Sequence, residues 1–201
     1  MGVAIDAAQL FGTNKPSTWP TALVTAAAAK SQAVDLSTII AGGGDLYDAL
    51  LGESGVISLL EADGFDVDGY IAAVALRGKM RGLRDANGNP IWNADYNAAF
   101  PYSIDGQSVA FPKNGAFDAS TALVVAGDWK QLVYAVREDI SFRIFDQGVI
   151  QDGSGVITLN LIQQAAKVMK VSMRLGFALP NPVNRMNSNS TTRYPFATLV
   201  P

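Results

Sequence analysis

Apolar and polar positions alternate along the stretch VYAVREDISFRIF in the second half of the chain. The alternation places Ile140, Phe142 and Ile144 on one face, and Ser141 and Arg143 on the other. Successive side chains of a β-strand point to opposite sides, so this pattern is typical of a strand with two unlike faces. It predicts one long strand that begins near the start of the stretch.

Three consecutive charged residues, Arg137, Glu138 and Asp139, lie in the middle of this strand. Such a cluster is costly inside a core and unnecessary on an ordinary surface. An enzyme could use the carboxylates, a binding protein could use the arginine, and a self-assembling shell could use all three against a neighbour. A local ion pair within the chain is an equally simple interpretation.

A second alternating stretch, KVMKVSMRLGFALP, lies near the C-terminus. Its polar face carries Lys170, Ser172 and Arg174. Its other face carries five apolar side chains, those of Met169, Val171, Met173, Leu175 and Phe177. We expect a strand whose apolar face is buried and whose Lys170 and Arg174 are exposed.

Two stretches favour helices. TALVTAAAAKSQAVD is rich in alanine, which has the highest helix propensity. In DLYDALLGESGVISLLEADGF, apolar residues recur near the helical period, and Asp45 can cap the first turn. Gly52 and Gly55 are expected to bend or split this second helix. The apolar positions that carry its period are Leu46, Leu50, Ile57 and Leu60.

A short buried strand, YIAAVA, is followed by a predicted helix that is rich in arginine. Arg77, Arg81 and Arg84 are spaced i, i+4 and i+7, so they are predicted to share one helix face. That face is either solvated or a contact surface for an acidic neighbour.

Further strands complete the pattern. SIDGQSVAF predicts a hairpin that turns at Asp105 and Gly106, and ALVVAGD predicts a buried strand. The last twenty residues hold prolines and little periodicity, and we expect an extended arm there. The fold class predicted from these elements is α+β with a mixed or antiparallel sheet.

Composition narrows the range of functions. Of the 201 residues, 49% are hydrophobic and only 16% are charged, which is the composition of a globular protein. The low charged fraction also indicates that part of the surface is buried against partners. A net charge of −3 argues against the basic stripe of a nucleic-acid reader, and no apolar run is long enough to span a membrane. The N-terminus has no signal-peptide pattern, so we expect a chain that works in bacterial cytoplasm or is released from it.

Enzyme chemistry has few residues to use. The sequence contains no histidine and no cysteine, which excludes Ser-His-Asp and Cys-His catalysis and the metal motifs built on those residues. Four carboxylates cluster in one apparent turn, where we expect them to be exposed, and the turn lacks the spacing of a calcium loop. These carboxylates belong to Glu61, Asp63, Asp66 and Asp68. We therefore expect no catalytic residue, no cofactor and no metal.

Five segments, taken in order, resemble the tailed-phage major capsid proteins of the Hong Kong 97-like fold. They are DAAQLFG with KPSTWP, GFDVDGYIAAVALRGKMRGLRDANGNPIW, SIDGQSVAFP, GDWKQLVYAVREDISFRIFD and MRLGFALPNPVNR. No segment is specific alone, but their order and spacing cover essentially the whole chain. The resemblance implies an axial-domain mixed sheet flanked by helices, together with part of the peripheral-domain strands.

The resemblance also implies a domain plan. Residues 1–34 and 165–180 would contribute to the peripheral domain, 35–164 would form the axial domain, and 181–201 a C-terminal arm. Family members carry an N-terminal arm, an extended loop and a spine helix before the matched region. We therefore expect an N-terminally truncated chain that folds without closing shells.

The function implied is structural. A major capsid subunit of a tailed phage or prophage assembles with copies of itself, as pentamers and hexamers, into an icosahedral shell around DNA. Scaffold, portal and decoration proteins are further partners that the resemblance implies. No sequence-specific nucleic acid and no membrane is implied. The protein would be made in the host cytoplasm and would be located in the virion. The candidate subunit contacts are Arg77, Arg81, Arg84, Arg137, Glu138, Asp139 and Arg143.

Two alternatives stay open at this stage. An encapsulin-type compartment shell protein would have the same fold and a cargo enzyme in place of DNA. A small glycan-processing enzyme would use the clustered carboxylates instead.

Overall fold

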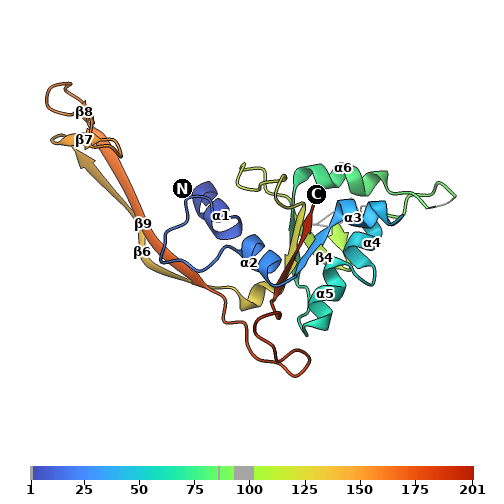
Figure 1. Cartoon of the computed structure of the whole chain (residues 1–201). Coiled ribbons are helices and arrows are strands. Elements are labelled where there is room, and N and C mark those ends of the chain that lie inside the picture. The colour runs from blue at the N-terminus through green and yellow to red at the C-terminus, as the bar shows by residue number, and fades with distance from the viewer. Residues whose placement is uncertain (1, 86, 93–101) are drawn as a thin grey trace. The chain divides into compact units, whose positions relative to one another are not determined.

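The computed structural model describes residues 2–85, 87–92 and 102–201 and divides the chain into two compact units (Figure 1). The sheet unit comprises Met1–Val133 and Leu179–Pro201, and the ribbon unit comprises Tyr134–Ala178. The boundaries expected at residues 34/35 and 164/165 fall inside these units.

The sheet unit is built on a six-stranded mixed sheet with the strand order β1-β10-β5-β2-β4-β3. The pairs β1–β10 and β2–β4 are parallel, and the other three pairs are antiparallel. The α+β class and the predicted hairpin, which turns at Asp105 and Gly106, are confirmed. The strands are β1 (Ala33–Asp35), β2 (Gly69–Ala72), β3 (Ser103–Ile104), β4 (Gln107–Ala110), β5 (Val124–Gly127) and β10 (Phe196–Val200).

The end of the chain differs from the extended arm that we expected. β10 lies between β1 and β5, and Phe196, Ala197 and Leu199 are fully buried. A five-residue apolar run is too short to show a period, so its strand character depends on partners that are distant in sequence. β1, which includes residues 33 and 34, pairs with β10, and β10 pairs with β5. The end of the 1–34 segment therefore belongs to the same sheet as β5.

Six helices are described in the sheet unit. Asp45 accepts hydrogen bonds from the backbone N–H groups of Tyr47 and Asp48, which confirms the predicted cap of α4. The predicted split is also confirmed, because α4 ends at Leu51 and α5 begins at Val56. The turn at Gly52 leaves no room for a side chain, since a Cβ atom there would lie 2.5 Å from the backbone oxygen of Asp48. The helices are α1 (Gly2–Leu10), α2 (Leu23–Ala29), α3 (Leu36–Ala41), α4 (Leu46–Leu51), α5 (Val56–Ala62) and α6 (Val74–Gly82), with a short 3-10 turn, η1, at Trp129–Gln131.

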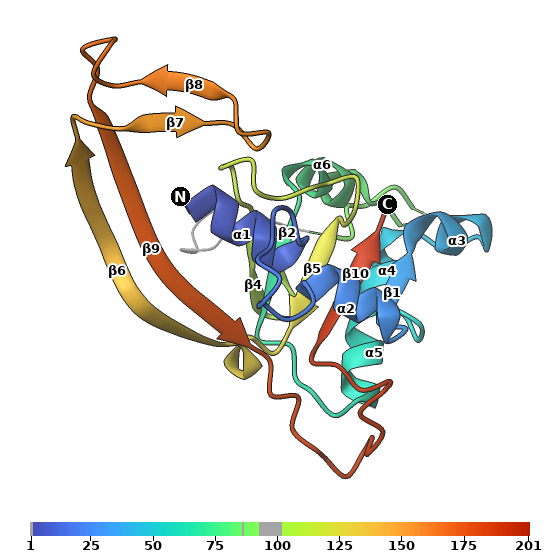
Figure 2. The same cartoon turned by 60° about the vertical axis from the view of Figure 1, so that its left-hand side comes forward.

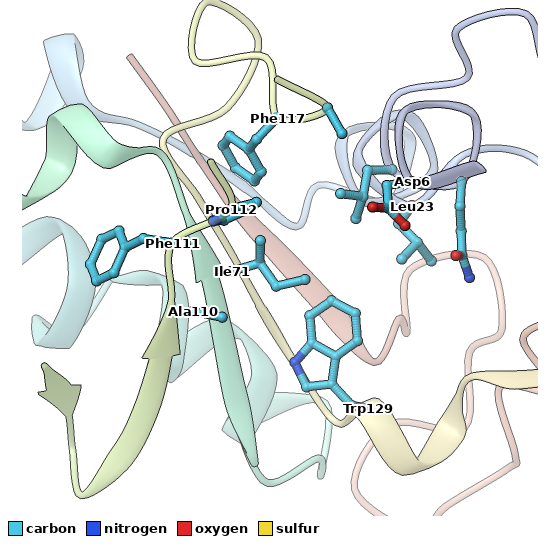
Figure 3. A pocket seen from close by; sticks show the side chains of 11 residues that line it. Asp6, Leu23, Ile71, Ala110, Phe111, Pro112, Phe117 and Trp129 are labelled. Atoms are coloured by element: carbon cyan, nitrogen blue, oxygen red, sulfur yellow. The ribbon is translucent and has the colours of Figure 1, made fainter. Parts of the chain in front are cut away.

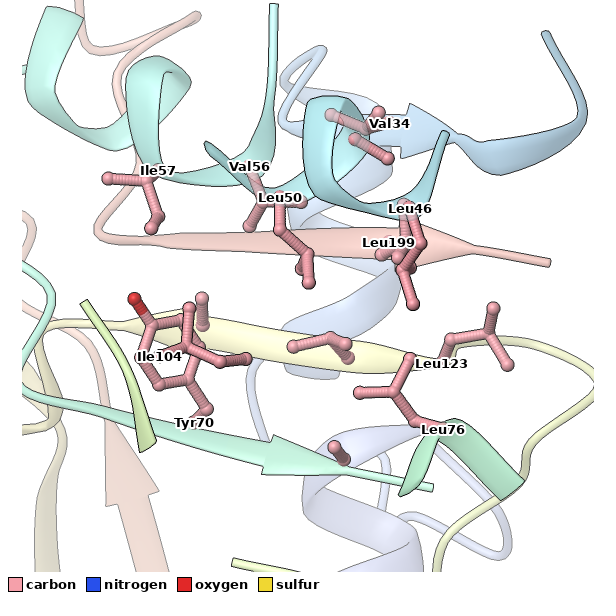
Figure 4. Close-up of a cluster of buried hydrophobic side chains, with 14 of the residues drawn as sticks. Val34, Leu46, Leu50, Val56, Ile57, Tyr70, Leu76, Ile104, Leu123 and Leu199 are labelled. Carbon is pink, nitrogen blue, oxygen red and sulfur yellow. The ribbon is translucent and has the colours of Figure 1, made fainter. Parts of the chain in front are cut away.

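Both faces of the sheet are covered. One cluster of buried side chains comes from α4, α5, α6 and the sheet, and includes Leu50, Leu76 and Val124 (Figure 4). A second cluster includes Leu23 of α2 and Val125 of β5. Because neighbouring residues of β5 enter different clusters, this strand is apolar throughout instead of alternating.

The ribbon unit contains two pairs of strands. The long strands β6 (Val133–Phe145) and β9 (Val168–Ala178) pair with each other and run antiparallel (Figure 2). The short strands β7 (Val149–Gln151) and β8 (Ile157–Asn160) form a separate antiparallel pair. The long strands predicted from the alternating stretches are both confirmed.

Candidate subunit interface

Cross-strand contacts identify a polar face of the ribbon. The hydroxyl oxygens of Ser141 on β6 and Ser172 on β9 lie 2.8 Å apart. Nε of Arg174 lies 3.2 Å from a carboxylate oxygen of Glu138. These four side chains therefore project from the same side of the two strands. The expectation of an ion pair within the chain is met, with Arg174 as the partner.

The opposite side of the two strands is apolar. Glu138 contacts Ser141 at 3.3 Å from three positions away, so the alternation of β6 is interrupted between these two residues. The neighbours of Ser141 and Ser172, and the residues that continue the alternation from them, point away from the two serines, which assigns five large side chains to one surface. We call this surface the apolar ribbon face. It consists of Ile140, Phe142, Ile144, Met169 and Val171, whose exposed fractions are 49%, 64%, 71%, 61% and 36%.

For the five apolar residues of β9 that were predicted to be buried, the prediction is wrong at Met169 and Val171, which are exposed, and correct at Phe177, which is 7% exposed. Met173 and Leu175 are half-buried. Residues 134–178 are all described, and within them no helix or second sheet covers the apolar ribbon face. A two-stranded ribbon cannot bury its own faces. Lys170 and Arg174 are exposed, as predicted.

The predicted charged residues of β6 take different positions. Arg137, Asp139 and Arg143 are exposed, and one Asp139 oxygen accepts a hydrogen bond from the backbone N–H of Ile140 at 2.7 Å. In the Glu138–Arg174 pair, the arginine side chain is 66% exposed. An exposed ion pair of this kind contributes only about 0–1 kcal/mol, so the pair adds little to the fold.

The arginines predicted to share a face of α6, at positions 77, 81 and 84, do not form one helix face. The guanidinium of Arg77 is half-buried over the rings of Tyr102, at 4.2 Å, and Phe111, at 5.4 Å. Arg81 is exposed on α6, whereas Arg84 lies beyond the last helical residue and donates to the backbone oxygen of Arg81 at 2.7 Å. The glycine at position 82 and the departure of Leu83 from helical geometry end α6 too early for the predicted spacing.

In the aspartate-rich turn, Asp63 is buried, although we expected its carboxylate to be exposed. The carboxylate of Asp63 is buried and accepts hydrogen bonds from Gln32 Nε2 (2.7 Å), Asn187 Nδ2 (2.7 Å) and the backbone N–H of Tyr194 (2.9 Å). Burial also raises the pKa of the Tyr194 phenol. We call this set of hydrogen bonds the Asp63 hub.

A second buried polar group, Arg193, continues the Asp63 hub. Its guanidinium is fully buried and donates to both oxygens of Asn181 and to the backbone oxygen of Asn187. Sequence reasoning missed this arginine and Asn187, because their partners are set by the tertiary fold. A buried charge of this kind must be hydrogen-bonded to persist.

The turn does not gather ligands for a metal. One oxygen of Asp68 accepts a hydrogen bond from the backbone N–H of Trp129 at 2.8 Å, and the other lies 3.7 Å from Lys130 Nζ. Within the described part of the chain, no group of three acidic, histidine or cysteine side chains could hold an ion. The same described residues include no helix that is long and apolar enough to cross a membrane.

An apolar sheet face that its own unit leaves uncovered is typical of a protein contact surface. The chain belongs to the phage capsid family, whose model matches residues 1–183. Among curated proteins, no significant match was found.

Solved structures agree on the fold. A chain from Microbacterium phage Oxtober96 is 29% identical, with a TM-score of 0.78 over 100% of this chain and 61% of that chain. Chains from Mycobacterium phage Cain (27% identity, TM-score 0.77, 100% and 61% covered) and Mycobacterium phage Bobi (29%, 0.75, 100% and 60%) are similar. The fold is the Hong Kong 97-like capsid fold, and the chain spans about 61% of the length of the first of these relatives. The comparisons support neither the compartment nor the glycan-processing alternative.

Proposed function

We propose that the chain is a structural subunit of the head of a tailed phage or prophage, a major capsid protein that assembles with copies of itself into an icosahedral shell around DNA. The apolar ribbon face is the observation that carries this proposal. Membership of the phage capsid family supports it independently.

The apolar ribbon face favours assembly because apolar surface that stays in water costs free energy. Phe142, Ile144 and Met169 are each more than 60% exposed and lie on one surface. Contiguous apolar surface of this kind marks a protein contact. A neighbouring protein surface in the particle covers the apolar ribbon face, and burial of apolar area contributes about 25 cal/mol per Å².

The exposed charged residues of the ribbon unit and of α6 have a second role. Arg137, Asp139, Arg143 and Arg81 are exposed and keep their charges available to neighbours. Charged contacts of this kind fix register and orientation more than they add affinity. Head-to-tail contacts between identical subunits close into rings, which are the pentamers and hexamers of the proposed shell.

The finer assignments follow from the same proposal. The sheet unit forms the axial domain, and the ribbon unit contributes strands of the peripheral domain. The protein is made in the host cytoplasm and resides in the virion, where portal, scaffold and decoration proteins are its other partners. It acts without enzymatic activity.

The test is a pair of isoleucine-to-lysine substitutions. Ile144 is 71% exposed on the apolar ribbon face, and Ile40 is 56% exposed on α3 of the sheet unit. We expect Ile144→Lys to weaken self-association of the chain at least tenfold in sedimentation, because it places a charge in a desolvated contact. Both variants should change the stability of the unassembled chain by only about 0.5 kcal/mol, as surface substitutions usually do.

Ile40→Lys is the matched control, since it makes the same chemical change on an exposed apolar residue elsewhere. If Ile144→Lys assembles as well as Ile40→Lys, the apolar ribbon face is not a subunit contact. The proposed role of this face would then be wrong.

A further inference from the structure

The sheet unit contains a cavity of about 360 Å³ between α1, α2, β2, β4 and the segment around residues 111–117 (Figure 3). Most of its wall is apolar or aromatic. The side chains that carry the argument are those of Asp6, Leu23, Ile71, Phe117 and Trp129. Cavities of about 300–1,000 Å³ with few polar groups are typical of small-molecule sites.

The aromatic walls are held in place before any ligand arrives. Nε1 of Trp129 donates to the backbone oxygen of Gly69 at 2.9 Å, and its ring packs edge-on against Phe196 at 5.0 Å. The ring of Phe117 is fixed in the same way by Phe11, at 5.2 Å. Because the indole N–H is already bonded, a ligand in the cavity meets the apolar ring of Trp129 and not a free donor.

One carboxylate lies among these apolar walls. Oδ2 of Asp6 accepts a hydrogen bond from Asn114 Nδ2 at 3.0 Å, which links α1 to the segment around residues 111–117. Asp6, Phe117 and Trp129 surround the same space in Figure 3. Among the described residues that line the cavity, none is a lysine or arginine, so the walls contain a negative charge without a cation.

We propose that this cavity binds a small organic cation with an apolar body, in particular an aromatic or branched aliphatic primary ammonium. The ammonium group pairs with Asp6 and lies near the π surfaces of Phe117 and Trp129, which attract cations. The apolar body fills the space beside Leu23 and Ile71. An engineered cavity of about 150 Å³ is enough to hold benzene, so a single substituted ring fits here with room to spare.

Charge complementarity favours a cation over an anion or a neutral ligand in this cavity. An anion of the same shape would be repelled by the Asp6 carboxylate, and a neutral ring would bring it no positive charge, so that Asp6 would keep only its bond from Asn114. The inference concerns the sheet unit alone and does not depend on the contact proposed for the apolar ribbon face.

Three probes that share a phenyl ring and differ in charge test the proposal on the chain itself: benzylamine, benzyl alcohol and benzoate. Binding is followed by ligand-observed NMR and by tryptophan fluorescence, since Trp129 lines the cavity. We expect saturable binding of benzylamine, at least tenfold weaker binding of benzyl alcohol, and no binding of benzoate. Equal binding of the three probes, or no saturation with benzylamine, would overturn the proposal.

Variants locate the site. Asp6→Asn should weaken benzylamine at least tenfold, whereas Asp66→Asn, a change to an exposed aspartate that does not line the cavity, should leave it unchanged. Ala110→Leu fills space from an exposed position on β4 and should weaken benzylamine and benzyl alcohol alike. Unchanged benzylamine binding in both Asp6→Asn and Ala110→Leu would show that the probe binds elsewhere. If binding is lost as protein concentration rises and a dimer appears in sedimentation, a second copy occupies the cavity and the free ammonium ligand is excluded.

Discussion

The carboxylate of Asp63 accepts a hydrogen bond from the backbone N–H of Tyr194 at 2.9 Å, across 131 positions of sequence. The Asp63 hub therefore joins the end of α5 to the segment that leads into β10. It also reaches Gln32, immediately before β1. Three regions that are distant in sequence meet at one buried carboxylate.

The first prediction concerns this carboxylate. Asp63→Ala should lower the free energy of unfolding by about 3 kcal/mol or more, because it leaves buried donors of Gln32, Asn187 and Tyr194 without an acceptor. Urea unfolding measures the change. Asp66→Ala, in the same turn but exposed, should stay within about 0.5 kcal/mol of the parent chain. Equal midpoints for the two variants would mean that the Asp63 hub does not stabilise the fold.

The second prediction compares two glycine-to-alanine changes. A Cβ atom at Gly127 would lie 2.6 Å from the backbone oxygen of Pro195 and would also collide with the ring of Phe196. Gly127→Ala should therefore destabilise the chain by about 2 kcal/mol, since β5 and β10 must separate. Gly78→Ala meets nothing within 4 Å and should stabilise α6 by about 0.5–1 kcal/mol. Thermal unfolding decides between the outcomes. Unchanged stability in Gly127→Ala would contradict the packing described for β5, and a loss of stability in Gly78→Ala would contradict the open space beside α6.

The third prediction concerns pH. The hydroxyl of Ser120 donates to the Asp118 carboxylate at 2.6 Å, and this bond is the main reason why the pKa of Asp118 is lowered. A carboxyl whose pKa is lower in the folded chain than in the unfolded chain contributes stability above its unfolded pKa. That contribution is lost as the pH falls through the folded pKa.

The experiment is an NMR titration of Asp118. Ser120→Ala should raise the pKa of Asp118 toward its ordinary value, while Ser120→Thr keeps a hydroxyl and should preserve the lowered pKa. An unchanged titration in Ser120→Ala would show that the hydroxyl of Thr121, the next contributor, controls this pKa instead.

Local signals in the sequence predicted the elements that depend on local chemistry. Alternation predicted β6 and β9, and glycines predicted the break between α4 and α5. The hairpin turn was readable because Asp105 and Gly106 both adopt positive φ, 47° and 75°, which these residue types tolerate best.

Features that depend on distant partners were not readable. β10 has too few residues for a period, and it is a strand because β1 and β5 flank it. The Asp63 hub needs side chains from two remote segments, so Asp63 resembled an exposed turn residue. The apolar ribbon face was correctly predicted as apolar, but a pattern cannot show whether the layer that covers it belongs to the same unit.

The position of β10 has a consequence for synthesis. Among the strands that the structure describes, β1 pairs with β10 alone, so Ala33 can pair only after its partner Thr198 has been translated. At roughly 5–20 residues per second, that wait is about 10 to 30 s, during which the sheet has an unfilled gap beside β5. Translation products that stop before Phe196 keep this gap and are expected to be degraded by the proteases that remove incompletely folded chains. The order of synthesis therefore makes β10 the last strand to enter the sheet, and a chain without it leaves one edge of β5 unpaired.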